Sequence, residues 1–253
     1  MMTKSSIKNS IIGSMIGVLI LFALWFLLYV TVANDYLIPS PIEVIQASFL
    51  NLVTLEFYSH LSSTILRVIF ALIISFTLGI FLAIPSHLFK NVENVMLPIL
   101  SVIRSLPVLA ILLIILIFTP RIVAPVIVCV LSLFPIVYSQ TLNYLNSISL
   151  KQREMLKLYK VPVKNQIFSV YLKGYLPLLI KESTTLFSFS LKLVVSAEIL
   201  ANVFKSIGGD ISNASICANV TQMFSLTLLV CLIGIIVEFF GKFICFQMEK
   251  KLQ

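Results

Sequence analysis

Long apolar stretches recur along the 253-residue chain, and shorter polar stretches separate them. A helix needs about 20 mostly apolar residues to cross the hydrocarbon core of a bilayer. The pattern therefore predicts an all-α polytopic membrane protein with about six transmembrane helices. The predicted spans are residues 11–33, 61–85, 96–118, 122–145, 178–201 and 222–246.

The first apolar stretch, residues 11–33, is longer than the core of about 7–15 residues found in secretory signal peptides. No A-x-A cleavage site follows it, so we expect a retained anchor. No long polar linker divides the remaining chain. Residues 1–253 are accordingly predicted to form a single transmembrane domain.

Composition agrees with this pattern, because 59% of the residues are hydrophobic and only 11% are charged. Soluble domains average about 45–50% and about 25%, so a soluble protein of this size is excluded. The net charge of +8 suggests either a nucleic-acid partner or the surplus of Lys and Arg that marks cytoplasmic loops. Only the distribution of the cations distinguishes the two.

The cations gather in alternate loops, which favours the topological explanation. Predicted cytoplasmic segments hold Lys4, Lys8, Lys90, the basic residues of 151–181, Lys242, Lys250 and Lys251. Predicted external segments hold only Arg121 and Lys205, and residues 34–60 contain three acids but no Lys or Arg. The positive-inside rule then places both termini in the cytoplasm and leaves no reason to expect nucleic acid.

The polar segment 151–181 is predicted to be cytoplasmic and bent. Pro162 disfavours helix at the preceding residue and suits the first turn of a new one. Two short helices are expected, with Met155, Leu158 and Tyr159 on one face of the first. Ile167, Val170 and Tyr171 share a face of the second. Such helices either lie on the anionic inner leaflet or dock onto a cytoplasmic protein.

Four charged residues fall inside predicted spans, where charge is costly and usually faces a pathway or a partner. They are Arg67, Arg104, Lys192 and Glu198. Arg67 either extends to the outer surface or faces inward. Lys192 and Glu198 either pair with a neighbouring helix or line a translocation path, for which Arg104 is the first candidate. Three cations against one acid favour an anionic solute.

An enzymatic site is not expected. The chain contains no G-x-x-x-x-G-K-[ST] phosphate loop, so it is not itself an ATPase. Neither His60 nor His87 has a partner at metal-ligand spacing, and the four cysteines show no C-x-x-C motif. We predict no catalytic residue, no metal site and no cofactor in this chain.

One stretch carries a recognisable spacing. Glu154 is followed six residues later by Lys160, and Val170 and Leu172 follow at the next fixed interval, with Pro177 beyond. This resembles the cytoplasmic coupling segment of bacterial ABC importer permeases, whose pattern is Glu-Ala-Ala, three residues, Gly, nine residues, then apolar-x-Leu-Pro. The departures are Met155, Leu156, Lys160 and Lys173. Because a lysine replaces the glycine, Pro162 is expected to make the corner.

Further stretches resemble the nitrate/sulfonate/taurine branch of this family, the binding-protein-dependent transport inner-membrane components, in the correct order. They are "LIPSPIEV" (37–44), "HLSSTILRVIFALIISFTLGI" (60–80), "RSLPVLAILLIILIF" (104–118) and "LKLVVSAEILAN" (191–202). The resemblance covers residues 37–245. It implies a type I ABC importer permease-like fold, with the coupling helix pair at 151–177 between the fourth and fifth spans.

The resemblance also implies partners. A permease of this kind works as a homodimer in the bacterial cytoplasmic (inner) membrane. Two ABC ATPase subunits bind ATP and Mg, and an extracytoplasmic solute-binding protein docks on the outer loops, residues 34–60 and 202–221. The residues expected to contact each ATPase are Glu154, Met155, Leu158, Tyr159, Lys160 and Pro162.

The implied solute is a sulfonate, nitrate or taurine-like anion, and a pyrimidine precursor of thiamine is the second candidate. The competing hypothesis is a secondary transporter or channel that needs no ATPase; such proteins often show internal repeats, and we find none convincing. A membrane scaffold would leave the intramembrane charges unexplained. Neighbouring genes for an ATPase and a secreted binding protein would separate these hypotheses.

Overall fold

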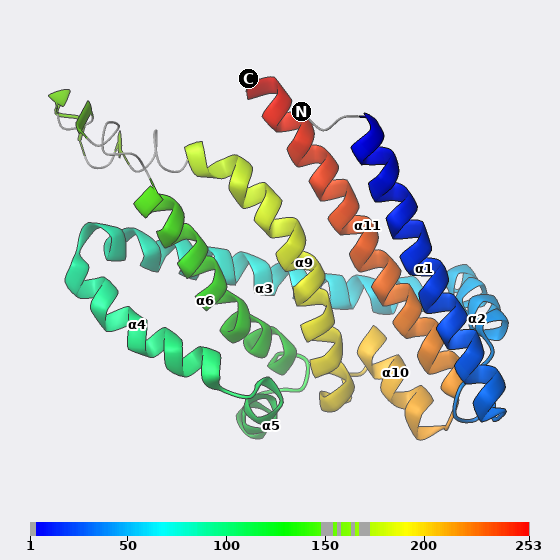
Figure 1. The fold of residues 1–253 in the computed structure, drawn as a ribbon. Helices are drawn as coiled ribbons and strands as arrows, with labels where there is room; N and C mark the ends of the chain where they lie inside the picture. The colour runs from blue at the N-terminus through cyan, green and yellow to red at the C-terminus, as the bar shows by residue number, and fades with distance from the viewer. Residues whose placement is uncertain (1–3, 148–153, 156–157, 163–164, 167–172, 253) are drawn as a thin grey trace.

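The computed structural model describes residues 4–147, 154–155, 158–162, 165–166 and 173–252. The described residues form helices joined by short turns, and Figure 1 shows their arrangement. The helices are α1 (Lys4–Val32), α2 (Pro41–Val53), α3 (Leu55–Leu88), α4 (Lys90–Ser105), α5 (Val108–Phe118), α6 (Ala124–Ser147), α9 (Lys173–Ala201), α10 (Ile207–Ile216) and α11 (Val220–Leu252).

Each predicted span falls within a helix or a helix pair to within two residues at its ends. Four segments of the described chain are long and apolar enough to cross a membrane: Leu55–Leu88, Ala124–Ser147, Leu178–Ala201 and Val220–Gly241. The predicted span 96–118 is not one straight helix, because α4 and α5 meet at a bend of 93°. Pro107 causes this break, since proline cannot donate the backbone hydrogen bond that would continue α4.

The first predicted span lies within α1 except for Ala33, and Ile16–Val32 is an apolar part of this helix. Its side chains from Ile16 onward are largely exposed in the single chain, as are the outer faces of α3 and α11. Exposed apolar surface on this scale needs lipid or another protein to cover it. The exposure therefore fits a multi-pass membrane protein.

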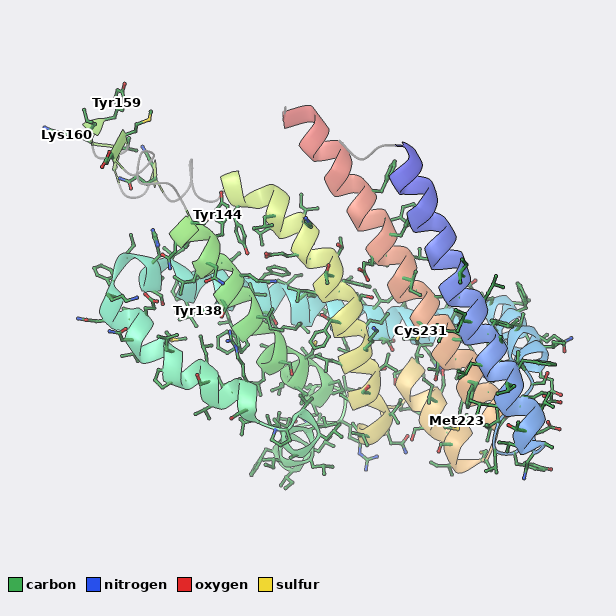
Figure 2. All side chains as sticks on the ribbon, in the orientation of Figure 1. Tyr138, Tyr144, Tyr159, Lys160, Met223 and Cys231 are labelled. Carbon is green, nitrogen blue, oxygen red and sulfur yellow. The ribbon has the colours of Figure 1, made fainter. Side chains whose placement is uncertain are left out.

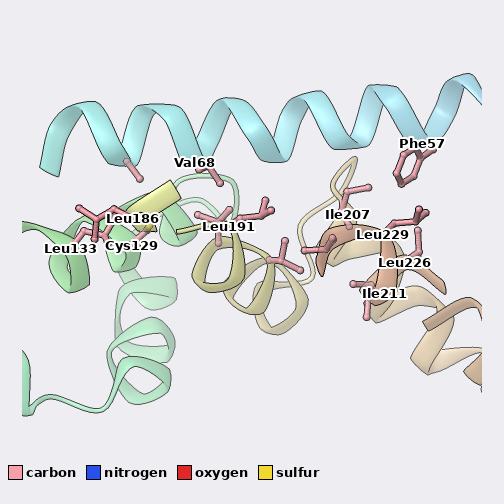
Figure 3. Packing of buried hydrophobic residues seen from close by; sticks show 14 of the residues in the cluster. Phe57, Val68, Cys129, Leu133, Leu186, Leu191, Ile207, Ile211, Leu226 and Leu229 are labelled. Carbon is pink, nitrogen blue, oxygen red and sulfur yellow. The ribbon is translucent and has the colours of Figure 1, made fainter. Parts of the chain in front are cut away.

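The long helix α3 runs behind α6 and α9 in Figure 1 and packs on both. The start of α1 and the end of α11 lie at the same end of the bundle as residues 154–155 and 158–162, whereas α10 lies at the opposite end. Figure 3 shows the main core beneath α3, where helices α6, α9, α10 and α11 converge. Its buried members include Val68, Leu133, Leu191, Ile207 and Leu229.

Two helices lie in segments that we predicted as external loops. Helix α2 begins after Ser40, whose Oγ accepts a hydrogen bond from the Ile42 amide at 3.3 Å. Pro41 at the first helical position is preorganised for helix. Helix α10 begins after Ser206, whose Oγ accepts from the Gly209 amide at 2.9 Å. Both are too short to span a bilayer, which is why a search for long apolar stretches missed them.

Candidate functional site

The most deeply buried charges join α3 to α9. Nη1 of Arg67 lies 2.6 Å from Oε1 of Glu198. The Glu198 side chain is fully buried and that of Arg67 is 12% exposed. Arg67 therefore does not extend to the outer surface, which was one of the two alternatives from the sequence. An isolated buried charge is costly, so each residue provides the charge that the other requires.

Glu198 receives further donors on its second oxygen. The Thr64 hydroxyl donates to Oε2 at 3.0 Å, and the Gly208 amide donates at 3.2 Å. Thr64 in turn accepts from the amide of Ile207 at 3.2 Å. A Cβ on Gly208 would overlap the Glu198 side chain and lie 2.7 Å from the carbonyl oxygen of Val195. Glycine is thus required here by close packing of α10 against α9.

A second polar pair lies one turn further out along α3. Nδ1 of His60 lies 2.7 Å from Oδ2 of Asp210, on α10. Residues 60, 64 and 67 are spaced to share one helical face, so the three polar side chains of α3 all meet α9 or α10. Burial raises the pKa of the Asp210 carboxyl above its ordinary value, and the hydrogen bond from His60 opposes this only in part.

Arg104 has very different surroundings at the end of α4. Its Nη2 donates to the carbonyl oxygen of Pro135 at 2.7 Å and also to the hydroxyl of Ser139, both on α6. The residue is exposed, and it lines a cavity beside the bend between α4 and α5. Lys192 is also exposed, on α9, and no hydrogen bond or ion pair is recorded for it within the described chain.

The structure therefore brings two of the four predicted intramembrane charges together and keeps the other two apart from them. Arg67 and Glu198 pair with each other, while Arg104 is held by neutral groups of α6. Asp210, which pairs with His60, was not among the predicted site residues. The Gly-Gly-Asp run after the capping Ser206 was the available signal for it, because acidic residues favour the first turn of a helix.

The described part of the coupling segment is exposed and bent. Leu158 and Tyr159 are 82% and 77% exposed, and Met155 is also exposed. Figure 2 shows Tyr159 and Lys160 beyond the ends of the bundle helices. The turn falls at Tyr159–Lys160, with Lys160 in the left-handed region at φ 48°. The backbone is also non-helical at Val161 and Pro162, so the corner spans Tyr159–Pro162 and begins before the proline that we expected to make it.

Pro162 starts the next helical turn, as the sequence predicted, since the Gln166 amide donates to its carbonyl oxygen at 3.0 Å. Left-handed backbone suits glycine best, so the conformation of Lys160 is one that favours the glycine usual at this place of the pattern. Glu154 is exposed and helical. The predicted second face (Ile167, Val170 and Tyr171) and Leu172 lie outside the described residues.

A polar cluster that the sequence did not reveal joins the two helices flanking this segment. The rings of Tyr144 (α6) and Tyr175 (α9) stack with centroids 4.8 Å apart. The Tyr175 hydroxyl donates to Glu182 at 2.9 Å, and Thr141 donates to the same hydroxyl at 3.1 Å. These contacts hold the end of α6 against the start of α9, the two helices between which the coupling segment lies in the sequence.

Comparison with known proteins places these features in context. The sequence profile of the family described as "Binding-protein-dependent transport system inner membrane component" matches residues 75–249. The formylaminopyrimidine transport permease protein ThiX of Halalkalibacterium halodurans is 29% identical over 92 residues, which is 36% of each chain. The match thus spans about a third of that relative's length.

A solved structure, described as an amino acid ABC transporter with histidines, has a TM-score of 0.61 to this chain. The identity is 18%, and the superposition covers 78% of this chain and 94% of the other. At this identity the likeness concerns the fold alone. It confirms the predicted fold class, an all-α polytopic membrane protein with a type I ABC importer permease-like arrangement.

Proposed function

Because this chain belongs to the family of binding-protein-dependent transport system inner membrane components, we propose that it is the permease subunit of an ATP-driven ABC importer. It moves a small solute across the bacterial cytoplasmic membrane, with both termini in the cytoplasm. The chain has no catalytic role of its own. ATP and Mg are bound by a separate ATPase subunit.

The proposed assembly contains two copies of this permease, two ABC ATPase subunits and an extracytoplasmic solute-binding protein. The binding protein docks at the end of the bundle that carries α10, which is opposite to the start of α1, the end of α11 and residues 154–155 and 158–162. The α2 and α10 helices form part of that docking surface. The distribution of cations along the sequence supports this orientation, because nearly all of them lie at the other side.

The observation that carries the proposal is the exposed apolar corner at Met155, Leu158 and Tyr159. These large apolar side chains lie beside a sharp turn outside the bundle, and their exposure to water is unfavourable unless a partner covers them. Their place in the sequence matches the coupling segment of the family, and they project on the side that we assign to the cytoplasm. Glu154, Lys160 and Pro162 complete the proposed ATPase contact.

The test is whether an ABC ATPase co-purifies with this chain. Leu158→Asp or Tyr159→Asp should abolish recovery of the ATPase while membrane insertion stays normal, because each places a charge in a buried apolar contact. Phe89→Asp is the matched control: it places the same charge on an exposed apolar residue at the turn between α3 and α4, outside the coupling segment, and should keep the complex intact. Normal recovery with both Asp variants would contradict the assignment.

The proposed solute is a small anion of the sulfonate, nitrate or taurine kind, as the nitrate/sulfonate/taurine branch resemblance implies. The cations in the spans support this choice. Formylaminopyrimidine, which appears in the name of the matched relative, is the alternative solute. We propose that Arg104 and Lys192 line the translocation path, and that Arg67 and Glu198, also candidates from the sequence, act instead by holding the outer end together.

A further inference from the structure

A cavity of about 240 Å³ lies beside the bend of the broken span, between α4, α5 and α6. Apart from Arg104 and Ser132, its lining residues are all leucine, isoleucine or valine. The Ser132 hydroxyl donates to the carbonyl oxygen of Val128, one turn earlier on α6. Among the described residues no carboxylate lines the cavity, so the Arg104 guanidinium provides the only full charge that they bring to it.

The guanidinium is fixed along one side and open along the other. Nη2 makes both of the hydrogen bonds recorded for Arg104, to Pro135 and Ser139. A guanidinium also carries N–H donors on Nε and Nη1, and within the described residues these have no recorded acceptor. The contacts with α6 therefore orient Arg104 without using its capacity for binding an anion.

A second source of positive potential reaches the same cavity. Val108, the first residue of α5, lines it, and no side chain caps that helix. The first amides of a helix lack acceptors within the helix, and its N-terminus carries partial positive charge. The bend at Pro107 separates α5 from α4 and leaves its first residue in the cavity that Arg104 also lines.

We propose that this cavity is a solute subsite, in which Arg104 and the start of α5 hold an oxyanion group of the solute on its way through the membrane. This proposal rests on the proposed function and states where along the translocation path the solute binds. Its apolar walls accept the remaining carbon skeleton of a small solute. The same chemistry also suits the phosphate of a lipid headgroup, so the experiment must separate the two sources.

The test uses the full-length chain in nanodiscs of phosphatidylcholine, with radiolabelled sulfate and taurine as probes. The parent should bind at least one of them saturably. Arg104→Met should weaken that binding about tenfold or more, because a charged hydrogen-bond donor is lost. Arg104→Lys should lose less affinity for the anion, because lysine keeps the charge but lacks the planar guanidinium with its paired N–H donors. Ser139→Ala should have a smaller effect, because it only loosens the orientation of Arg104.

Arg121→Met is the matched control, since it removes an exposed arginine beyond the other end of α5 and should leave binding unchanged. Size-exclusion profiles establish that each variant is folded. The proposal is overturned if the parent binds neither anion, or if Arg104→Met binds as the parent does. It is also overturned if formylaminopyrimidine binds the parent and Arg104→Met equally while the anions do not compete.

A lipid site would show a different result. Phosphatidylglycerol would co-purify with the parent and not with Arg104→Met, and its addition to the nanodiscs would abolish anion binding; that pattern also overturns a solute subsite. Recovery of the ATPase with the same preparations tests the proposed function separately. A chain that recruits its ATPase but binds no anion refutes the subsite alone.

Discussion

Two arginines on neighbouring helices, Arg67 and Arg104, show how differently the same side chain is used within this bundle. Arg67 is buried and directed at a carboxylate whose two oxygens both accept hydrogen bonds. Arg104 is exposed and held only by neutral groups, with donors left over beside a cavity. The first arrangement is complete without a ligand, whereas the second is not. The presence of a charged partner therefore distinguishes a structural charge from a candidate binding charge better than the position of the residue along its span.

The largest effect on stability is expected from breaking the pair of Arg67 and Glu198. Glu198→Ala leaves Arg67 buried without a counter-charge, and removing one partner of a buried pair typically costs about 3–5 kcal/mol. We expect the free energy of unfolding, measured by titration with SDS in mixed micelles, to fall by that amount. The double variant Arg67→Met/Glu198→Met should recover part of the loss. A loss near zero in the single variant would show that the pair contributes little.

The next effect concerns the close approach of α10 to this pair. Gly208→Ala introduces a Cβ against backbone and side-chain atoms of α9, and overpacking of this kind typically costs about 1–3 kcal/mol. The same unfolding titration measures it. Gly13→Ala is the matched control, because a Cβ there meets no atom within 4 Å. Equal stability of the two variants would mean that α10 can move away from α9 at little cost.

The fold was predictable where long apolar stretches determine it, as for α3, α6, α9 and α11. The short helices α2 and α10 were not, because their length falls below what the membrane requires and their signal is a serine cap. Charge alone identified Arg67 and Glu198 as important. It did not reveal that they pair, because 131 residues separate them along the chain.

The coupling corner shows a similar limit. The spacing from Glu154 to Lys160 located an exposed turn, but Pro162 did not indicate that the turn begins at Tyr159 with Lys160 in left-handed backbone. A lysine in left-handed backbone is uncommon, so local propensity favoured Pro162 instead. The stacking of Tyr144 on Tyr175 depends on how α6 and α9 meet, and no local pattern in either helix indicates it.

Arg104 gives the third prediction, with a smaller effect on stability than on transport. Because the residue is exposed and paired only with neutral groups, Arg104→Met should change the free energy of unfolding by no more than about 1 kcal/mol. Uptake of the solute by proteoliposomes that contain the full transporter should nevertheless fall about tenfold or more, by loss of a charged hydrogen bond. A loss of stability as large as that of Glu198→Ala would remove the distinction between the two arginines.

The smallest effect is expected at the second polar pair, where Asp210 meets His60 and lies near Glu56. Burial raises the pKa of Asp210 above its ordinary value of 3.8. The folded chain then holds this proton more tightly than the unfolded chain. That contribution to stability is present in full below pH 3.8 and is lost as the pH rises through the raised pKa.

Asp210→Asn should flatten the dependence of thermal stability on pH in that acidic window, whereas Asp210→Glu, which keeps a carboxyl group, should retain it. If thermal stability depended on pH in Asp210→Asn as it does in the unmodified chain, the titration of this carboxyl would not be linked to folding.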